Sequence, residues 1–254
     1  MSILKSFFSK EENIQASSEL KEFLTDFSIE VMPRTASKIK SFREILPKNT
    51  RVYVAHIDGV PIEEMVDTAK RISNEGFDVM PHFPARIIKD KKMLEEWIQK
   101  YQDEAGIEQA LLLAGGVSNP HGVFDSSMQL VETELFEKYN FKNLHFAGHP
   151  EGNKDIDHDG TTKNVDEALQ WKQNFSERTD IKLAITTQFC FDADPVINWA
   201  DSLIESGINI PIHIGVAGPA KLQTLIKFSI ACGVGPSLKV LQKRAKDVKK
   251  LLLP

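Results

Sequence analysis

Glu30 is the residue whose position in the sequence best suits acid–base chemistry. Apolar and polar residues alternate over residues 26–31, which predicts a short buried strand with this carboxyl group near its end. A glutamate in such a place is seldom buried without a partner or a task. Two interpretations stay open from the strand alone: an ion pair with Arg34 or Arg51, and a general acid or base.

Other polar residues recur where later strands are expected to end. In an α/β fold with parallel strands, the carboxyl ends of the strands form the edge at which ligands bind. A single histidine at a strand end is more often a structural group, but several on one edge favour a functional site. These residues are His56 and Asp58, His82, His149 and Glu151, Gln188 and Asp192, and His213.

An acidic loop offers a separate metal-binding hypothesis. Asp155, Asp157, Asp159 and Gly160 match the first half of a calcium loop, with Asp166 at its twelfth position. The preceding segment is expected to be a strand instead of a helix, and the twelfth residue is the shorter acid. A solvated acidic loop is therefore favoured over a metal site, and a metal-dependent enzyme remains a distant alternative.

The order of elements predicts an α/β fold. Seven strands are expected, each followed by a helix, with the repeat at roughly 25 to 35 residues. Helices are expected over 36–46, 62–75, 93–104, 126–139, 163–175, 195–206 and 220–231. The strands are expected at 26–31, 51–55, 77–81, 109–113, 143–147, 183–187 and 210–214.

Strands joined in this way form an open doubly wound sheet or a closed barrel. The units are regular in length, and the Gly-rich strand-to-helix turn of dinucleotide-binding sheets is missing. These features favour a (β/α)8 TIM-type barrel, although an eighth strand is not evident in the sequence. We expect a helical lead-in over 1–25 and a single barrel domain over 26–254.

Composition excludes several classes of partner. The chain has 254 residues with 31 Lys+Arg against 36 Asp+Glu, a net charge of -5, so no basic field favours nucleic acid or an anionic membrane. Cys190 and Cys232 lack the spacing of a zinc or redox pair, and no apolar run reaches the length of a membrane span. We expect a cytoplasmic protein, with the basic segment 237–251 as a solvated helical face.

Four segments in chain order resemble the methylenetetrahydrofolate reductase family. They are Phe27-Ser-Ile-Glu30-Val, Pro81-His82-Phe, Ala147-Gly-His-Pro-Glu151 and Ile185-Thr-Thr-Gln188-Phe-Cys-Phe-Asp192. The resemblance covers roughly residues 25 to 235. It implies a flavin-bearing barrel that moves a hydride from NADH or NADPH through FAD to 5,10-methylenetetrahydrofolate, giving 5-methyltetrahydrofolate.

The resemblance also implies roles for individual residues. Glu30 matches a general acid, and burial at the rim of an apolar barrel is expected to raise its pKa. Gln188 matches a folate contact, because an amide both donates and accepts hydrogen bonds. Cofactor contacts are expected at His82, Gly115, Gly116, His149, Asn153, Asp166 and Lys172.

One departure from the family leaves an alternative open. The sequence reads Ala114-Gly115-Gly116 where the family carries Arg-Gly-Asp beside the flavin. The chain is then expected to be either a reductase of this kind or a folate- or flavin-binding barrel that has lost the reaction or acts on another folate. In both cases the partner is a small molecule, and the oligomeric state is left open.

Overall fold

A computed structural model describes residues 18–218, 220–231 and 242. The strands are β1 (Ser28–Val31), β2 (Arg51–Val54), β3 (Asp78–Pro84), β4 (Gln109–Leu113), β5 (Asn143–Gly148), β6 (Lys182–Cys190) and β7 (Ile212–Val216). The helices are α2 (Ser18–Phe23), α3 (Pro33–Ala36), α4 (Ile62–Asn74), α5 (Lys91–Ala105), α6 (Ser127–Val131), α7 (Leu135–Lys138), α8 (Lys163–Ser176), α9 (Ala193–Glu205) and α10 (Leu222–Ala231). Two short 3-10 helices are η1 (Phe42–Glu44) and η2 (Ala85–Ile87).

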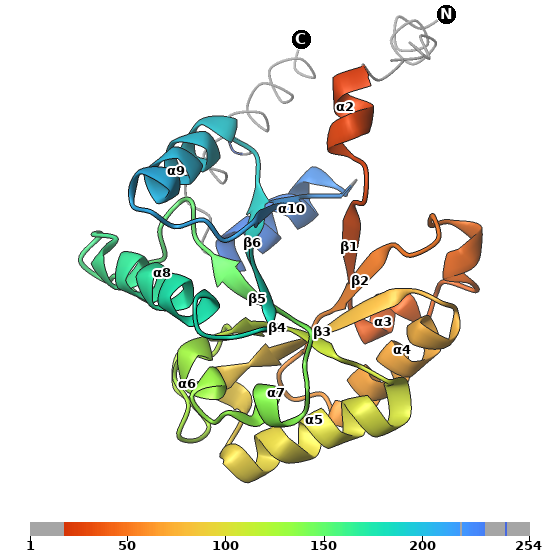
Figure 1. Cartoon of the computed structure of the whole chain (residues 1–254). Helices are drawn as coiled ribbons and strands as arrows, with labels where there is room; N and C mark the ends of the chain where they lie inside the picture. Colours follow the sequence, from red (N-terminus) through yellow and green to blue (C-terminus); the bar gives the residue numbers. More distant parts are fainter. Residues whose placement is uncertain (1–17, 219, 232–241, 243–254) are drawn as a thin grey trace, which may run out of the picture.

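Within the described residues, the strands lie parallel in one seven-stranded sheet, in the order β1-β2-β3-β4-β5-β6-β7. When parallel strands follow one another in sequence order and every crossover is right-handed, the connecting helices lie on the same face of the sheet. Figure 1 shows this arrangement, with the sheet curled and helices α4, α5, α8 and α9 around its outside. The other face is concave and is left to side chains.

The expectation of a closed (β/α)8 barrel is wrong. The seven-stranded sheet is open: β1 and β7 are its two edges in the part of the chain that the structure describes. The physical reason for the error is that regular strand-helix units build open and closed sheets alike. Closure depends on the number of strands and on the shear of the sheet, and neither can be read from the length of the strand-helix units.

The apolar core lies between the outside of the sheet and the helices. Phe83, Leu112, Phe146 and Ile98 are fully buried there and belong to one continuous cluster. The concave face holds a much smaller apolar cluster, made of Tyr53, Met80 and Leu111 with Leu113 packed against it. The concave face and the carboxyl edge of the sheet therefore leave room for polar side chains.

Every expected strand overlaps an observed one, with bounds that differ by up to three residues, but two expected helices differ. The helix expected over 36–46 is wrong, because α3 ends at Ala36 and a separate 3-10 turn follows. The helix expected over 126–139 is divided into α6 and α7, where Glu134 has a positive φ of 61° that no continuous helix allows. The lead-in contains α2, while residues 1–17 and the basic segment 237–251, apart from residue 242, lie outside the described residues.

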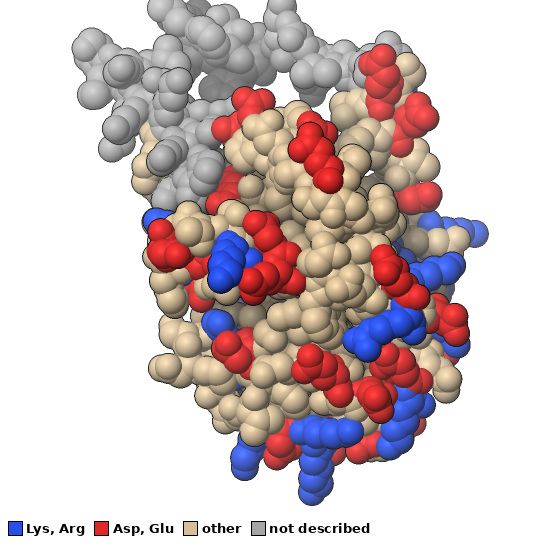
Figure 2. Space-filling model, turned by 60° about the vertical axis from the view of Figure 1, so that its left-hand side comes forward, with Lys and Arg blue, Asp and Glu red and all other residues tan. Residues whose placement is uncertain are grey.

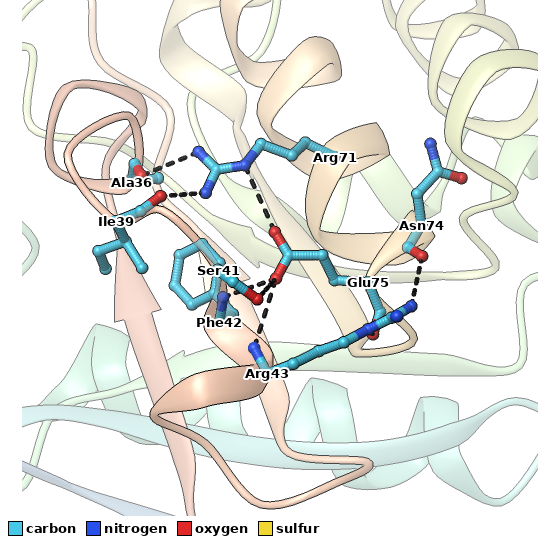
Figure 3. A network of polar contacts seen from close by, with 8 residues as sticks. All are labelled: Ala36, Ile39, Ser41, Phe42, Arg43, Arg71, Asn74 and Glu75. Carbon is cyan, nitrogen blue, oxygen red and sulfur yellow. Dashed lines mark hydrogen bonds and ion pairs between the residues drawn. The ribbon is translucent and has the colours of Figure 1, made fainter.

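Glu75 joins the end of α4 to the irregular segment after α3 (Figure 3). Its carboxylate accepts the backbone N–H of Phe42 at 2.6 Å and contacts Arg71 at 3.4 Å. Arg71 also donates to the backbone carbonyl oxygens of Ala36 and Ile39. These contacts satisfy backbone groups that a continuous helix would have paired internally, which explains why the segment ends its helix early.

Charged side chains on the surface are mixed in sign. Figure 2 shows Asp and Glu across the visible face, with Lys and Arg beside them in its lower part. One such pair joins Lys100 and Glu63 at 2.6 Å. Within the described ranges, no helix combines the length and the apolar character needed to cross a membrane.

We predict that Glu75→Gln lowers the free energy of unfolding by about 1–2 kcal/mol, because the amide keeps the shape but loses the charge-assisted bonds. Burial raises the pKa of Glu75, but the N–H groups of the segment and the charge of Arg71 lower it by a larger amount. The pKa of Glu75 therefore lies below its ordinary value. The stabilisation is therefore present above the ordinary pKa and is lost as the pH falls through the folded value. Urea titration at pH 7 and at acidic pH measures both effects.

The matched control is Glu104→Gln, which removes an exposed ion pair to Lys70 with an N–O distance of 3.7 Å. This control should change stability by under about 0.5 kcal/mol. Equal effects of the two substitutions would show that the Glu75 contacts add nothing beyond a surface ion pair.

Candidate functional site

Glu30 and His82 meet at the carboxyl edge of the sheet, on the concave side. Glu30 lies on β1 and His82 on β3, and the carboxylate Oε2 is 3.4 Å from Nε2 of the imidazole. The glutamate side chain is 58% exposed, while that of the histidine is 10% exposed. Neither arginine considered from the sequence is its partner: Arg51 instead pairs with Asp78 at 3.1 Å.

The protonation state of Glu30 differs from the expectation. Desolvation raises the pKa of Glu30, but the neighbouring imidazole of His82 outweighs this effect, so the pKa lies below the ordinary value. The expected raised pKa is therefore wrong, because the sequence did not place the imidazole beside the carboxyl group. Glu30 is a carboxylate at neutral pH and suits a base better than an acid.

A buried polar cluster occupies the concave face below this pair. The Tyr53 hydroxyl lies 2.7 Å from Nδ1 of His145, and Thr186 Oγ1 lies 3.2 Å from the same nitrogen. Burial and the charges of Arg51 and His213 lower the pKa of His145 to about 3. The imidazole therefore stays neutral at all ordinary pH values and serves as a fixed hydrogen-bonding group.

Other predicted edge residues have local partners. His56 stacks on Trp97 of α5 with ring centroids 4.6 Å apart, and burial lowers its pKa to about 4. Asp58 lies 3.9 Å from His121, so it joins the loop after β2 to the loop after β4. Gln188 is exposed and its side-chain oxygen accepts the N–H of Phe189. Asp58 and Gln188 thus have local partners, whereas the buried Nδ1 of His56 has no hydrogen-bond partner among the described residues.

A cavity of about 520 Å³ opens beside the carboxyl ends of β4 and β5, between α6 and α8. Its lining mixes three kinds of group. Apolar and aromatic side chains include Ile156, Leu169 and Trp171; carboxylates come from Asp125, Asp155 and Glu167; cations come from Arg86 and Lys172. A volume of this size suits a small ligand or one half of a larger one.

Lys172 is the unusual member of this cavity. It is 5% exposed, and its ammonium donates to the carbonyl oxygen of Ala147 at 3.1 Å and lies 5.6 Å from the centre of the Phe146 ring. In the part of the chain that the structure describes, no carboxylate lies within ion-pair distance of it. Burial lowers the pKa of Lys172 to about 8. A buried cation without a counter-charge is costly and indicates a place for an anionic ligand.

Of three other expected cofactor contacts, only His149 lines this cavity, while Asn153 and Asp166 do not. His149 lines it, and burial with the charge of Lys172 lowers the pKa of the imidazole to about 4. Asn153 contacts the ring of His149 at 3.4 Å, while Asp166 accepts the hydroxyl of Thr162 and faces solvent. Of these residues, the structure thus brings His149, Asn153 and Lys172 together.

Gly115 and Gly116 follow β4 at the same edge. Gly115 has a φ of 100°, and a Cβ at this position would lie 3.1 Å from that of Pro84, so a larger residue would be strained here. The preceding Ala114 lines the cavity. The turn therefore lets the chain leave β4 close to β3 and borders the cavity.

The acidic loop 155–160 is explained by helix capping. Both carboxylate oxygens of Asp157 accept backbone N–H groups at the start of α8, from Asn164 at 3.0 Å and Val165 at 3.1 Å. Asp159 accepts the N–H of Thr161 at 3.0 Å. Among the described residues, no group of three or more His, Cys, Asp or Glu side chains could hold a metal ion.

Sequence reasoning missed two parts of the site. Tyr53 follows Arg51 by two residues on β2, and His145 follows Asn143 by two residues on β5. Residues two apart on a strand point to the same face, so this alternation could have placed Tyr53 and His145 on the concave face. Arg86 and Asp125 lie in loops and pair at 2.8 Å. No local sequence signal identifies that second pair.

Comparison with known proteins does not identify a family. No family model matches this chain. Among solved structures, the chain is similar to a metagenomic short-chain oxidoreductase (SDR) in complex with NADP, with 10% sequence identity and a TM-score of 0.35. The match covers 77% of this chain and 98% of that chain. A likeness this distant carries no information about the ligands of this chain.

The predicted membership of the methylenetetrahydrofolate reductase family is therefore wrong. No family model supports it, and within the described residues the sheet is open where that family has a closed barrel. The expected FAD, the folate substrate and the alternative folate- or flavin-binding barrel lose their basis with it. Its four segments are short strand ends bearing Glu, His or Gln, which any parallel sheet with a polar carboxyl edge can carry.

We predict that Lys172→Met raises the free energy of unfolding at pH 7 by roughly 2–3 kcal/mol, since it removes a buried cation without a counter-charge. The pKa of Lys172 in the folded protein lies below the value of 10.5 for a solvated lysine. Between about pH 8 and pH 10.5, the unfolded chain therefore keeps the proton on Lys172, whereas the folded chain loses it. Wild-type stability should then rise with pH above about 8, and the advantage of the variant should shrink. Denaturation at pH 7, 8 and 9.5 measures this difference, and a constant difference would contradict it.

Proposed function

We propose that the protein is an oxidoreductase that uses NADH or NADPH, with Glu30 and His82 as its proton-transfer pair. The observation that carries the proposal is the cavity beside β4 and β5, in which Lys172 is buried without a counter-charge. Both the pair and the cavity lie at the carboxyl edge of the sheet, where parallel α/β folds bind their ligands.

The lining of the cavity fits one nucleotide half of a dinucleotide. The indole of Trp171 with Ile156 and Leu169 offers apolar surface for a base. The carboxylates of Asp155 and Glu167 can accept hydrogen bonds from ribose hydroxyl groups. A phosphate beside Lys172 would supply its missing counter-charge. The three kinds of group that a nucleotide needs thus occur in one cavity.

Glu30 and His82 supply what a nicotinamide ring cannot. When bound, the nicotinamide accepts or gives the hydride of the reaction. Oxidation of an alcohol also releases a proton from the hydroxyl group, and the carboxylate of Glu30 can take it. His82, at 3.4 Å, stabilises the carboxylate form and sets its orientation. Reduction of the carbonyl product returns the same proton.

Titration with NADH and NADPH, followed by nucleotide fluorescence, tests the cofactor site. The wild type should bind one of them, with ADP-ribose as a competitor, and Lys172→Met should weaken binding by roughly tenfold through the loss of one charge-assisted contact. The matched control is Lys92→Met on α5, where the lysine side chain is 85% exposed and contacts Glu96 at 3.7 Å. A wild type that binds neither nucleotide would overturn the proposal, as would equal binding by both variants.

Turnover of a panel of primary and secondary alcohols with NAD+ and NADP+ tests the proton-transfer pair. We predict that Glu30→Gln reduces turnover by about 100-fold or more and leaves nucleotide affinity within about twofold. Because the pKa of Glu30 lies below its ordinary value of 4.5, wild-type activity should persist down to about that pH. Unchanged turnover in the variant would show that another group transfers the proton.

A further inference from the structure

We infer that Lys172 is a nucleophilic amine that forms an imine with small aldehydes entering the cavity between α6 and α8. This inference concerns the reactivity of the side chain itself and does not rest on the proposed cofactor. It starts from the position of the amine, which is buried on α8 yet borders a cavity of about 520 Å³.

Three contacts define the surroundings of the amine. Its nitrogen donates to the carbonyl oxygen of Ala147 at 3.1 Å and lies 5.6 Å from the centre of the Phe146 ring, and Lys172 is one of the residues that line the cavity. The Ala147 carbonyl accepts a hydrogen bond equally well from an ammonium group and from a neutral amine. The geometry therefore holds the nitrogen in place when it is uncharged.

The charges around the cavity do not stabilise the ammonium form by direct contact. Asp125, Asp155 and Glu167 line the same cavity, but within the described residues none of them is within 4.0 Å of the amine. Asp125 is instead paired with Arg86 at 2.8 Å. His149 lines the same cavity, and its pKa of about 4 keeps it neutral. An amine in these surroundings loses its proton far more easily than one in water.

The chemistry follows from a neutral amine that meets a carbonyl compound in a confined space. The nitrogen adds to the aldehyde carbon, and the C–O bond then breaks while the C=N bond forms. Both hydrogens of the amine leave with the oxygen as water, and no oxidant or reductant takes part. The apolar part of the cavity favours the imine because it limits the water that would hydrolyse it.

Reductive labelling of the intact protein tests the inference. Pyridoxal with sodium cyanoborohydride converts each imine to a stable secondary amine, which peptide mapping by mass spectrometry locates. At pH 7.5 we expect Lys172 to be labelled at least about tenfold faster than Lys92, because a far larger fraction of it is unprotonated. The rate at Lys172 should level off above about pH 8, while the rate at Lys92 should continue to rise.

Two controls keep the result decisive. Lys172→Arg retains a cation at this position but cannot form the imine, so it should lose only the fast label. Slow labelling of Lys172 in the wild type, at or below the rate of Lys92, would overturn the inference. Adding NADPH separates the two proposals: protection of Lys172 supports the cofactor site, while unprotected fast labelling contradicts that site alone and leaves the reactive amine standing.

Discussion

The sequential order of the parallel strands is the constraint on which the rest of the structure depends. Because β1 to β7 lie side by side in chain order, the helices pack on one face and the carboxyl ends of the strands meet at one edge. That edge brings together Glu30 of β1 and His82 of β3, which are separated by a whole strand-helix unit in the sequence. It also brings Ala114, after β4, and His149, after β5, into the lining of the same cavity.

Burial then determines what each polar group can do. The imidazole of His82 lowers the pKa of Glu30. Burial away from water lowers the pKa of three basic groups and favours their neutral forms: His145, His149 and Lys172. These groups are therefore one stable carboxylate, two uncharged imidazoles, and one amine that loses its proton more easily than it would in water. This separation of charge states is what an acid–base site requires, and it arises from position more than from residue type.

Much of the fold could be predicted from the sequence, because strand positions follow local periodicity. Every expected strand was found, and Glu30 and His82 were both expected at the edge. Closure of the sheet was not predictable, since it depends on the pairing of distant edges. The early end of α3 depends on Glu75, more than thirty residues away, and the pairing of Glu30 with His82 depends on the sheet order. The resemblance to a reductase family failed because short polar strand ends are not specific to one fold.

The central claim is that a nucleotide binds across the carboxyl edge, from the cavity between α6 and α8 on the helix side to Glu30 on the concave side. A crystal structure of the protein soaked with NADPH tests this most directly. The account predicts a phosphate group in hydrogen-bond contact with Lys172 and the nicotinamide ring on the side of Glu30 and His82. A nucleotide bound elsewhere on the molecule, with the cavity between α6 and α8 filled only by solvent, would contradict it.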